Sequence, residues 1–311
     1  MIYLSGFADE AADGIAGQIE VIKALGWKGI ELRSVEGINA HDLPDKDFDT
    51  VRRALDKAGI QVNCLGSTIA NWGKKVDEDR AATMATVERA IARMKALGTK
   101  MIRIMSYAID MDGQGQPLAD QRFSERVSRL NEICGRFAAE GITPVHENCL
   151  NYGGMSWGHT LELLEAVPAL RLVFDTGNPS LTPDFSKPHP YPNQDAWEAW
   201  KKLKSKVVHL HVKDGWRDPV TGEETYVYPG EGPSKVAEIL ADCLASGYSG
   251  WLTIEPHMAV VFHDASVHSP AERRKAVFIE YGRRVEAMLE DLGAKVADGV
   301  AATCWANGGM A

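Results

Sequence analysis

Four carboxylate or imidazole side chains stand at the ends of four successive apolar segments in the second half of the chain. They are Glu147, Asp175, His211 and Glu255, in the stretches TPVHENC, LRLVFDTG, VVHLHVKDG and GWLTIEP. Their separations of 28, 36 and 44 residues each fit about one strand and one helix. If the strands are parallel neighbours, the four groups meet at one end of the sheet.

This set of side chains suits a divalent metal ion. Three carboxylates in one place would repel one another, and a divalent cation between them removes that repulsion. Three carboxylates with one imidazole suit Mn²⁺, Mg²⁺ or Co²⁺, and the absence of cysteine ligands argues against structural zinc. A lone strand-end carboxylate is often only a helix cap. The coincidence on four strands nevertheless favours a metal site. Because His209 and His211 face the same side of one strand, one of them can brace the other.

Short apolar runs alternate with longer amphipathic runs along the chain, in eight strand–helix units. Four of the helical runs in the first half lead into a glycine, as the end of a helix often requires: Gly26, Gly59, Gly98 and Gly141. Eight such units predict a single (β/α)₈ TIM barrel over residues 1–293, with residues 294–311 as a C-terminal extension. The competing fold, an open doubly wound sheet, usually carries a GxGxxG turn after its first strand, and SGFADEAADG does not match it.

Composition narrows the class of protein. The chain has 311 residues, 45% of them hydrophobic, and a net charge of −9, which disfavours binding to nucleic acid or to anionic membranes. The five cysteines are scattered without a CxxC pair, as expected for reduced thiols. No signal peptide and no apolar run long enough for a membrane span are visible. We therefore expect a soluble cytoplasmic protein.

Six motifs make the chain resemble a known family. They are LSGFADE, HEN, FDTGN, HLHVKD, PGEG and TIEP. The chain resembles the sugar phosphate isomerase/epimerase superfamily, the xylose isomerase-like barrels, over about residues 1–290. The resemblance implies one divalent metal, Mn²⁺ in the first place with Mg²⁺ or Co²⁺ as alternatives, held by Glu147, Asp175, His211 and Glu255. It also implies a sugar or keto-sugar substrate and a homo-oligomer.

The ketose epimerases of this family suggest a reaction. In them the two glutamate ligands, here Glu147 and Glu255, act as acid and base on opposite faces of the sugar. One removes the proton alpha to the carbonyl and the other returns it across an enediolate that the metal stabilises. The first predicted function is therefore a metal-dependent isomerase or epimerase. The endonuclease branch of the family needs three metals and further histidines on the third and fourth strands. Here those strands end in NCLGS and RIMSY, which contain no histidine, so an endonuclease is disfavoured.

Several residues are predicted to bind the substrate, two of them by the same resemblance. Arg217 matches a substrate-contacting arginine, and Asn178 stands where ketose epimerases tend to carry a histidine. Lys213 could hold a hydroxyl or phosphate group, or it could be a solvated strand-end charge. Trp216 is one of several tryptophans and tyrosines on the predicted mouth-side loops, with Trp72, Tyr152, Trp157 and Tyr228. They could stack on a sugar or an aromatic aglycone, or simply pack the loops or a dimer surface.

A lyase is the alternative function. Some relatives cleave 3-keto-glycosides by β-elimination, and inosose dehydratases eliminate water. In such a reaction His146 or His257 could protonate or deprotonate the leaving group. His257, two residues past Glu255, is also a predicted substrate contact, or it could merely cap a loop. His146 neighbours Glu147 in the strand, so its other interpretation is a histidine packed behind the barrel wall. A third hypothesis is a sugar-binding subunit without catalysis. The turn YPGEG, finally, is expected to let the backbone approach a ligand, although it lacks the lysine of a nucleotide-binding loop.

Overall fold

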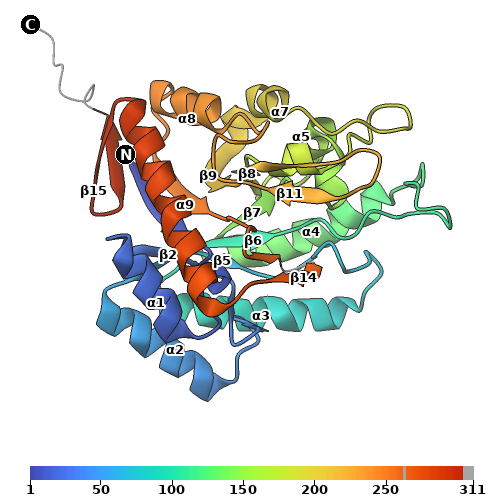
Figure 1. Cartoon of the computed structure of the whole chain (residues 1–311). Helices are drawn as coiled ribbons and strands as arrows, with labels where there is room; N and C mark the ends of the chain where they lie inside the picture. The colour runs from blue at the N-terminus through green and yellow to red at the C-terminus, as the bar shows by residue number, and fades with distance from the viewer. Residues whose placement is uncertain (262–263, 304–311) are drawn as a thin grey trace, which may run out of the picture.

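Eight parallel strands form the centre of the molecule (Figure 1). The computed structural model describes residues 1–261 and 264–303. The strands are β1 (Ile2–Gly6), β2 (Gly29–Leu32), β5 (Gln61–Gly66), β6 (Met101–Ile104), β7 (Thr143–Glu147), β8 (Arg171–Asp175), β9 (Val207–Val212) and β12 (Gly250–Ile254). Hydrogen bonds link them in the order β1, β12, β9, β8, β7, β6, β5, β2. Apart from the pair of β1 and β12, every hydrogen-bonded pair therefore joins two of the eight strands that follow one another in the chain.

The sheet curves until its two ends, β1 and β2, lie against each other. At Gly29 in β2, an added Cβ atom would stand 3.0 Å from the carbonyl oxygen of Leu4 in β1. The same atom would meet the ring of Trp251 in β12. An added methyl group at Gly29 would therefore be overpacked between the Trp251 ring and β1.

Replacing Gly29 by alanine is expected to lower the free energy of unfolding by about 1–3 kcal/mol, the usual cost of overpacking a core. Gly135 is the matched control, because an added Cβ there meets nothing within 4 Å and the residue lies inside helix α4 (Phe123–Ala138). Gly135→Ala should raise the free energy of unfolding by about 0.5–1 kcal/mol. Urea denaturation measures both values, and a Gly29→Ala protein as stable as Gly135→Ala would contradict the close approach of β1 and β2.

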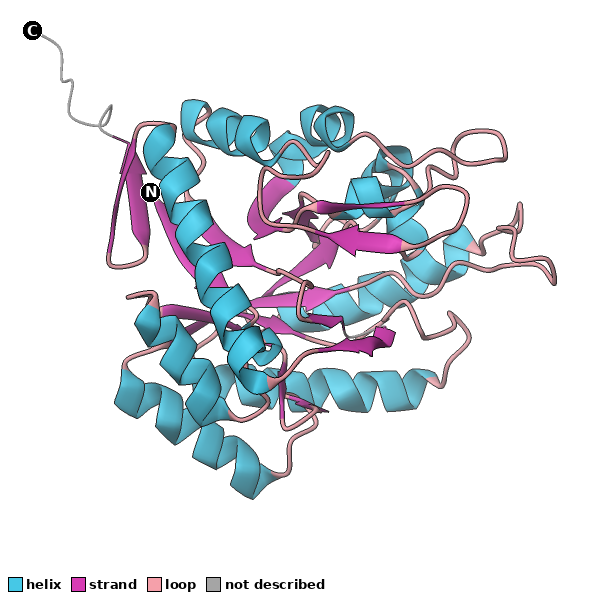
Figure 2. Ribbon diagram, viewed as in Figure 1, coloured by secondary structure: helices cyan, strands magenta, loops and turns pink. Residues whose placement is uncertain are grey.

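Helices cover the outside of the strands (Figure 2). The longer ones are α1 (Ile15–Ala24), α2 (Asp45–Ala58), α3 (Arg80–Leu97), α4, α5 (Trp157–Ala166), α7 (Ala196–Leu203), α8 (Val236–Ala245) and α9 (Ala271–Asp291). Short helical turns are η1 (Ala8–Glu10), η2 (Tyr152–Met155), α6 (Asn178–Leu181) and η3 (Lys204–Lys206). Gly59 and Gly98 end α2 and α3 in the left-handed conformation, both with φ of 69°. In the described part of the chain, no helix combines the length and apolar composition that a membrane span requires.

Four antiparallel hairpins accompany the parallel strands. Three of them follow β2, β9 and β12: β3 (Ser34–Val35) with β4 (Ile38–Asn39), β10 (Gly215–Arg217) with β11 (Glu224–Tyr226), and β13 (Val260–Val261) with β14 (Asp264–His268). The fourth, β15 (Ala294–Ala297) with β16 (Val300–Thr303), pairs antiparallel with β1. The first ten residues of the predicted C-terminal extension thus form this hairpin, and residues 304–311 lie outside the described residues.

Strand alternation decides which side chains enter the barrel. In β7, Val145 and Glu147 lie on one face, and in β8 Val173 and Asp175 do so. Val145 and Val173 pack with Cys64 of β5 in a small buried cluster. The two carboxylates lie one step nearer the C-terminal ends of the strands. The cluster of Val145, Val173 and Cys64 therefore fills the barrel interior below the two carboxylates.

Candidate metal centre and active site

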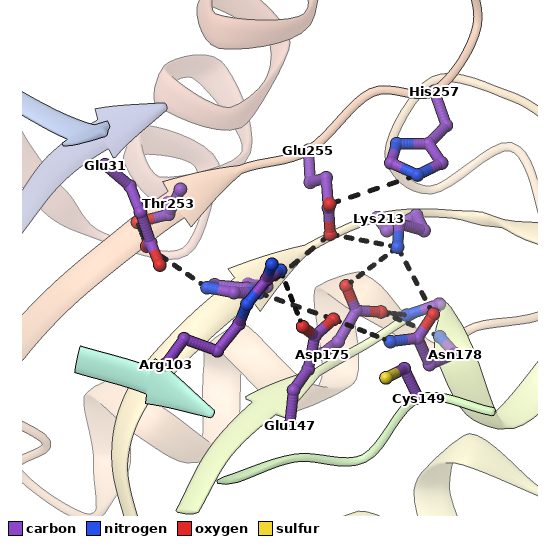
Figure 3. A network of polar contacts seen from close by, with 12 residues as sticks. Glu31, Arg103, Glu147, Cys149, Asp175, Asn178, Lys213, Thr253, Glu255 and His257 are labelled. Carbon is purple, nitrogen blue, oxygen red and sulfur yellow. Dashed lines mark hydrogen bonds and ion pairs between the residues drawn. The ribbon is translucent and has the colours of Figure 1, made fainter. Parts of the chain in front are cut away.

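The four predicted metal ligands converge at the C-terminal ends of β7, β8, β9 and β12. One ligand atom from each of Glu147, Asp175, His211 and Glu255 lies within 4.8 Å of the others. All four side chains are buried, and Figure 3 shows the three carboxylates turned toward a common space. Buried carboxylates in such proximity need positive charge among them.

Three buried atoms of this cluster make no hydrogen bond with the described residues. They are Asp175 Oδ2, His211 Nδ1 and Glu255 Oε2. His211 Nδ1 lies 3.7 Å from Glu147 Oε1 and 3.9 Å from Glu255 Oε2. Lys213 Nζ lies within ion-pair distance of the two carboxylate oxygens in this set, and among the described residues His211 Nδ1 has no hydrogen bond. Buried polar atoms that lack a hydrogen bond are rare in native proteins, and here they leave positions for an ion or a ligand. The donors, oxygen with one imidazole nitrogen, fit Mn²⁺, Mg²⁺ or Co²⁺.

Asp175 divides its two oxygens between a loop and the cluster. Oδ1 accepts backbone hydrogen bonds from Gly177 at 2.8 Å and from Asn178 at 2.7 Å. Oδ2 is left for the cluster. Burial raises the pKa of Asp175 to about 6, against the opposing charge of Lys213. The two interpretations of a strand-end aspartate, cap and ligand, are therefore compatible in this one residue.

Each glutamate of the cluster is paired with an arginine. Arg103 Nη1 donates to Glu147 Oε2 at 2.9 Å, and Arg33 Nη1 donates to Glu255 Oε1 at 2.8 Å. Burial alone would raise the pKa of Glu147, but Arg103 lowers it to about 2. Burial would also raise the pKa of Glu255, and Lys213 and Arg33 hold it well below its usual range. Both glutamates are therefore ionised at neutral pH.

Lys213 carries a third positive charge into the cluster. Its Nζ lies 2.9 Å from Glu255 Oε2 and 3.3 Å from Asp175 Oδ2, without the alignment of a hydrogen bond to either oxygen. It donates to Asn178 Oδ1 at 3.2 Å. Although burial alone would lower it, the pKa of Lys213 is raised well above its ordinary value by Asp175 and Glu255. The alternative that Lys213 is a solvated charge is wrong, because its side chain is buried.

A buried carboxylate outside the four-residue cluster orients His211. Glu31, in β2, accepts hydrogen bonds at Oε2 from His209 Nε2 at 2.7 Å, from His211 Nε2 at 3.1 Å and from Thr253 Oγ1 at 2.8 Å. A carboxylate on one ring nitrogen leaves the other nitrogen, here Nδ1, as the ligand atom. His209 and His211 thus share one brace, and Glu31 rather than His209 holds the ligand imidazole.

A cavity of about 480 Å³ opens at the cluster. Glu147 and Glu255 line it, together with the predicted substrate residues Lys213, Asn178 and His257. His257 Nε2 lies 3.9 Å from Glu255 Oε1, and its Nδ1 bonds to Glu10 Oε1 at 2.9 Å. The predicted acid/base pair and three of its predicted substrate contacts therefore share one cavity.

Comparison with known proteins identifies the fold family. A family model described as the xylose isomerase-like TIM barrel matches residues 19–284. The chain belongs to this family. The match confirms the resemblance and the TIM barrel predicted from the sequence. No curated protein sequence matches the chain.

Solved structures with a similar fold match the chain over most of its length. The probable 3-DHS dehydratase AsbF from Bacillus anthracis is 17% identical with a TM-score of 0.66, over 92% of this chain and 98% of that chain. D-psicose 3-epimerase from Clostridium cellulolyticum H10, with D-tagatose, is 15% identical with a TM-score of 0.64, over 94% and 98%. A xylose isomerase-like TIM barrel protein from Mycobacterium smegmatis, in complex with magnesium, is 17% identical with a TM-score of 0.60, over 91% and 96%. At these identities the likeness shows the fold.

Three predicted site residues of this xylose isomerase-like barrel do not line the cavity. His146 lies on the face of β7 opposite Glu147, where its Nε2 contacts Ser106 Oγ at 3.0 Å and Asn151 Oδ1 at 2.9 Å. Burial lowers the pKa of His146 to about 4. The catalytic role predicted for His146 is therefore not supported, because strand alternation places the ring behind the barrel wall. Arg217 and Trp216 lie in β10, outside the cavity.

Sequence reasoning missed three charged residues of the site: Glu31, Arg33 and Arg103. Glu31 and Arg33 stand in GIELRSV, and Arg103 stands in KMIRIMSY. A charged residue within an apolar strand is the signal that could have found them, since such a side chain is rarely buried without a partner. The partners of these three residues lie far from them in the sequence, so the sequence alone does not identify the contacts.

Glu31→Gln is expected to weaken Mn²⁺ binding by about 10–100-fold, as loss of an outer partner of a metal-bound histidine does. The amide keeps the shape of the carboxylate and removes the charge that fixes the His211 tautomer. Isothermal titration calorimetry with Mn²⁺ measures the change. Glu224→Gln, a carboxylate that lines the cavity outside the four-residue cluster, should retain the wild-type affinity. Equal affinities of the two variants would contradict the orienting role of Glu31.

Proposed function

We propose that this protein is a divalent-metal-dependent isomerase or epimerase that moves a proton alpha to the carbonyl of a keto-sugar. The observation that carries the proposal is the pair of ionised glutamates, Glu147 and Glu255, that line one cavity. They come from β7 and β12, which two other strands separate in the sheet. A sugar bound in the cavity would be within reach of both carboxylates, so that one could remove a proton and the other could return a proton to the opposite face.

The residues present would hold the metal and the substrate together. Glu147, Asp175, His211 and Glu255 would bind one Mn²⁺, with Mg²⁺ or Co²⁺ as alternatives. A bound divalent ion would supply electrophilic stabilisation of the negative charge that develops on the carbonyl oxygen. The magnesium complex of the Mycobacterium smegmatis relative supports a divalent ion in this fold.

The proton transfers fall to the two glutamates. One carboxylate would remove the proton from the carbon alpha to the carbonyl, and the other would return a proton to the opposite face. Lys213 and Asn178 line the cavity and would hold substrate hydroxyl groups. The D-psicose 3-epimerase with D-tagatose supports this class of substrate for the fold.

A lyase acting on a keto-sugar is the second candidate function, and the position of His257 favours it. His257 lines the cavity beside Glu255 and is backed by Glu10, so it would protonate a leaving group while a glutamate takes the alpha proton. The probable 3-DHS dehydratase among the solved relatives supports an elimination in this fold. We keep a soluble cytoplasmic protein and a homo-oligomer as predictions.

Mass spectrometry of products formed in D₂O tests the proposal. The Mg²⁺-loaded protein is incubated with a panel of keto-sugars, inososes and 3-keto-glycosides. An isomerase or epimerase adds one deuterium alpha to the carbonyl and otherwise leaves the mass unchanged. A product lighter by water or by an aglycone would assign the lyase instead. Absence of exchange and of elimination across the panel would contradict both functions.

A further inference from the structure

A buried carboxylate of the chain itself binds backbone amides of the loop after the seventh strand, a loop that contributes to phosphate binding in many TIM barrels. The phosphate site of those barrels is formed by the loops after the seventh and eighth strands, at the N-terminus of a helix. Here the loop after β9, the seventh strand, carries Asp214, whose side chain accepts four backbone hydrogen bonds. The donors are Gly215 at 2.9 Å, Gly230 at 2.9 Å, Gly232 at 3.0 Å and Ser234 at 3.2 Å.

This contact explains the PGEG turn. Gly230 has a φ of +87°, and a Cβ atom at Gly232 would collide with the Asp214 carboxylate. From the sequence we expect the turn to let the backbone approach a ligand. In the structure its backbone instead approaches the side chain of Asp214. Because these amides are used inside the chain, they are not available for a phosphate group.

The cations that line the cavity are also paired with carboxylates. Among the described lining residues, Arg33 contacts Glu255 at 2.8 Å, Arg103 contacts Glu147 at 2.9 Å, and Lys213 contacts Glu255 at 2.9 Å. A phosphate group would bring further negative charge next to these carboxylates. The charged floor of the cavity thus suits the hydroxyl and carbonyl groups of a neutral sugar.

Two large apolar side chains with exposed surface also line the same cavity. Trp72, on the loop after β5, is 47% exposed, and Leu150, on the loop after β7, is 49% exposed. Both line the cavity, as do the buried side chains of Met105 and Leu181. Pockets that bind small molecules are lined mainly by hydrophobic and aromatic side chains, so these four residues offer contacts to an apolar group. The volume of about 480 Å³ falls within the range of sites that take ligands of drug size.

We infer that the substrate is an unphosphorylated sugar that carries an apolar aglycone, with the sugar on the charged floor and the aglycone against Trp72 and Leu150. This inference rests on the proposed function for the sugar half of the ligand. The inference adds the chemical class of the aglycone and excludes sugar phosphates as substrates. A flat aromatic aglycone suits the tryptophan, because stacked aromatic rings gain energy beyond their buried area.

Binding of three unreactive probes tests the inference without any turnover. The probes are 4-nitrophenyl β-D-glucopyranoside, methyl β-D-glucopyranoside and glucose 6-phosphate, titrated by calorimetry into the Mg²⁺-loaded protein. The aryl glycoside should bind about tenfold more tightly than the methyl glycoside, the gain that one added stacking contact gives. Glucose 6-phosphate should bind no better than the methyl glycoside.

Variants locate the aglycone site. Trp72→Ala and Leu150→Ser should reduce the preference for the aryl glycoside and leave the affinity for the methyl glycoside unchanged. Trp216→Ala is the matched control, since Trp216 is also exposed, at 38%, but does not line the cavity. It should keep the full aryl preference.

The outcomes separate this inference from the proposed function. Equal binding of the aryl and methyl glycosides, or tightest binding of glucose 6-phosphate, would overturn the inference even if deuterium exchange into free keto-sugars establishes the isomerase. An aryl preference that Trp72→Ala removes would support it even if no exchange is seen. Failure of all three probes to bind at millimolar concentration would overturn the sugar class itself.

Discussion

Glu255→Gln and Glu147→Gln are each expected to lower turnover by about 10²–10⁴-fold, the usual contribution of a general acid or base. Glutamine keeps the size of each side chain and can still accept a hydrogen bond from Arg33 or Arg103, so the fold should survive. It cannot accept a proton from carbon. The assay is turnover of the keto-sugar identified by deuterium exchange, at saturating metal so that weaker metal binding does not limit the rate.

Deuterium exchange in the two variants would show which face of the sugar each glutamate serves. In Glu147→Gln, Glu255 remains able to remove the proton on its own face and return a solvent deuteron there. We therefore expect slow deuterium incorporation without inversion of the carbon, and the mirror result in Glu255→Gln. Glu198→Gln, an exposed carboxylate on α7, is the control and should show wild-type turnover. Normal turnover in either active-site variant would contradict the acid/base pair.

Asp175→Asn is expected to weaken Mn²⁺ binding by about 100-fold or more, beyond the range seen for loss of outer partners of a metal site. The substitution is selective, because the amide oxygen can keep the backbone hydrogen bonds from Gly177 and Asn178 while the charge of Oδ2 is lost. Equilibrium dialysis with Mn²⁺ measures the affinity. Turnover at limiting metal should fall in the same proportion.

Asp184→Asn is the matched control for this variant. Asp184 is also buried and caps a turn, with Oδ1 accepting from the backbone of Ser186 at 3.0 Å. It does not belong to the four-residue cluster, so its loss of charge should leave Mn²⁺ affinity unchanged. Equal affinities of Asp175→Asn and Asp184→Asn would show that the Asp175 charge does not bind the metal.

Strand periodicity made the barrel and its four-residue cluster predictable. Each of Glu147, Asp175, His211 and Glu255 follows an apolar strand by a fixed offset, and parallel strands bring such positions to one height. The same periodicity places His146 behind the wall, which was one of its two sequence interpretations. Local spacing was sufficient for these residues because their neighbours in space are set by the order of the strands.

The remaining parts of the site depend on contacts that no local pattern encodes. Arg33 forms a hydrogen bond with Glu255, and Glu31 forms one with His211, although the partners are far apart in the sequence. Trp216 was expected at the mouth, but the β10–β11 hairpin holds it outside the cavity, where Tyr226 of β11 lines the wall instead. Hairpin and loop conformations of this kind follow from tertiary packing rather than from the sequence of the loop.

Anomalous diffraction from a Mn²⁺-soaked crystal would test the central claim most directly. The account predicts one peak per chain, with oxygen or nitrogen ligands from Glu147, Asp175, His211 and Glu255 at about 2.0–2.2 Å. Two other clusters of potential ligands offer a clear alternative: Glu31 with Cys64 and His209, and Glu10 with Glu255 and His257. A peak at either of these, or no peak at saturating Mn²⁺, would contradict the metal centre on which the proposed reaction depends.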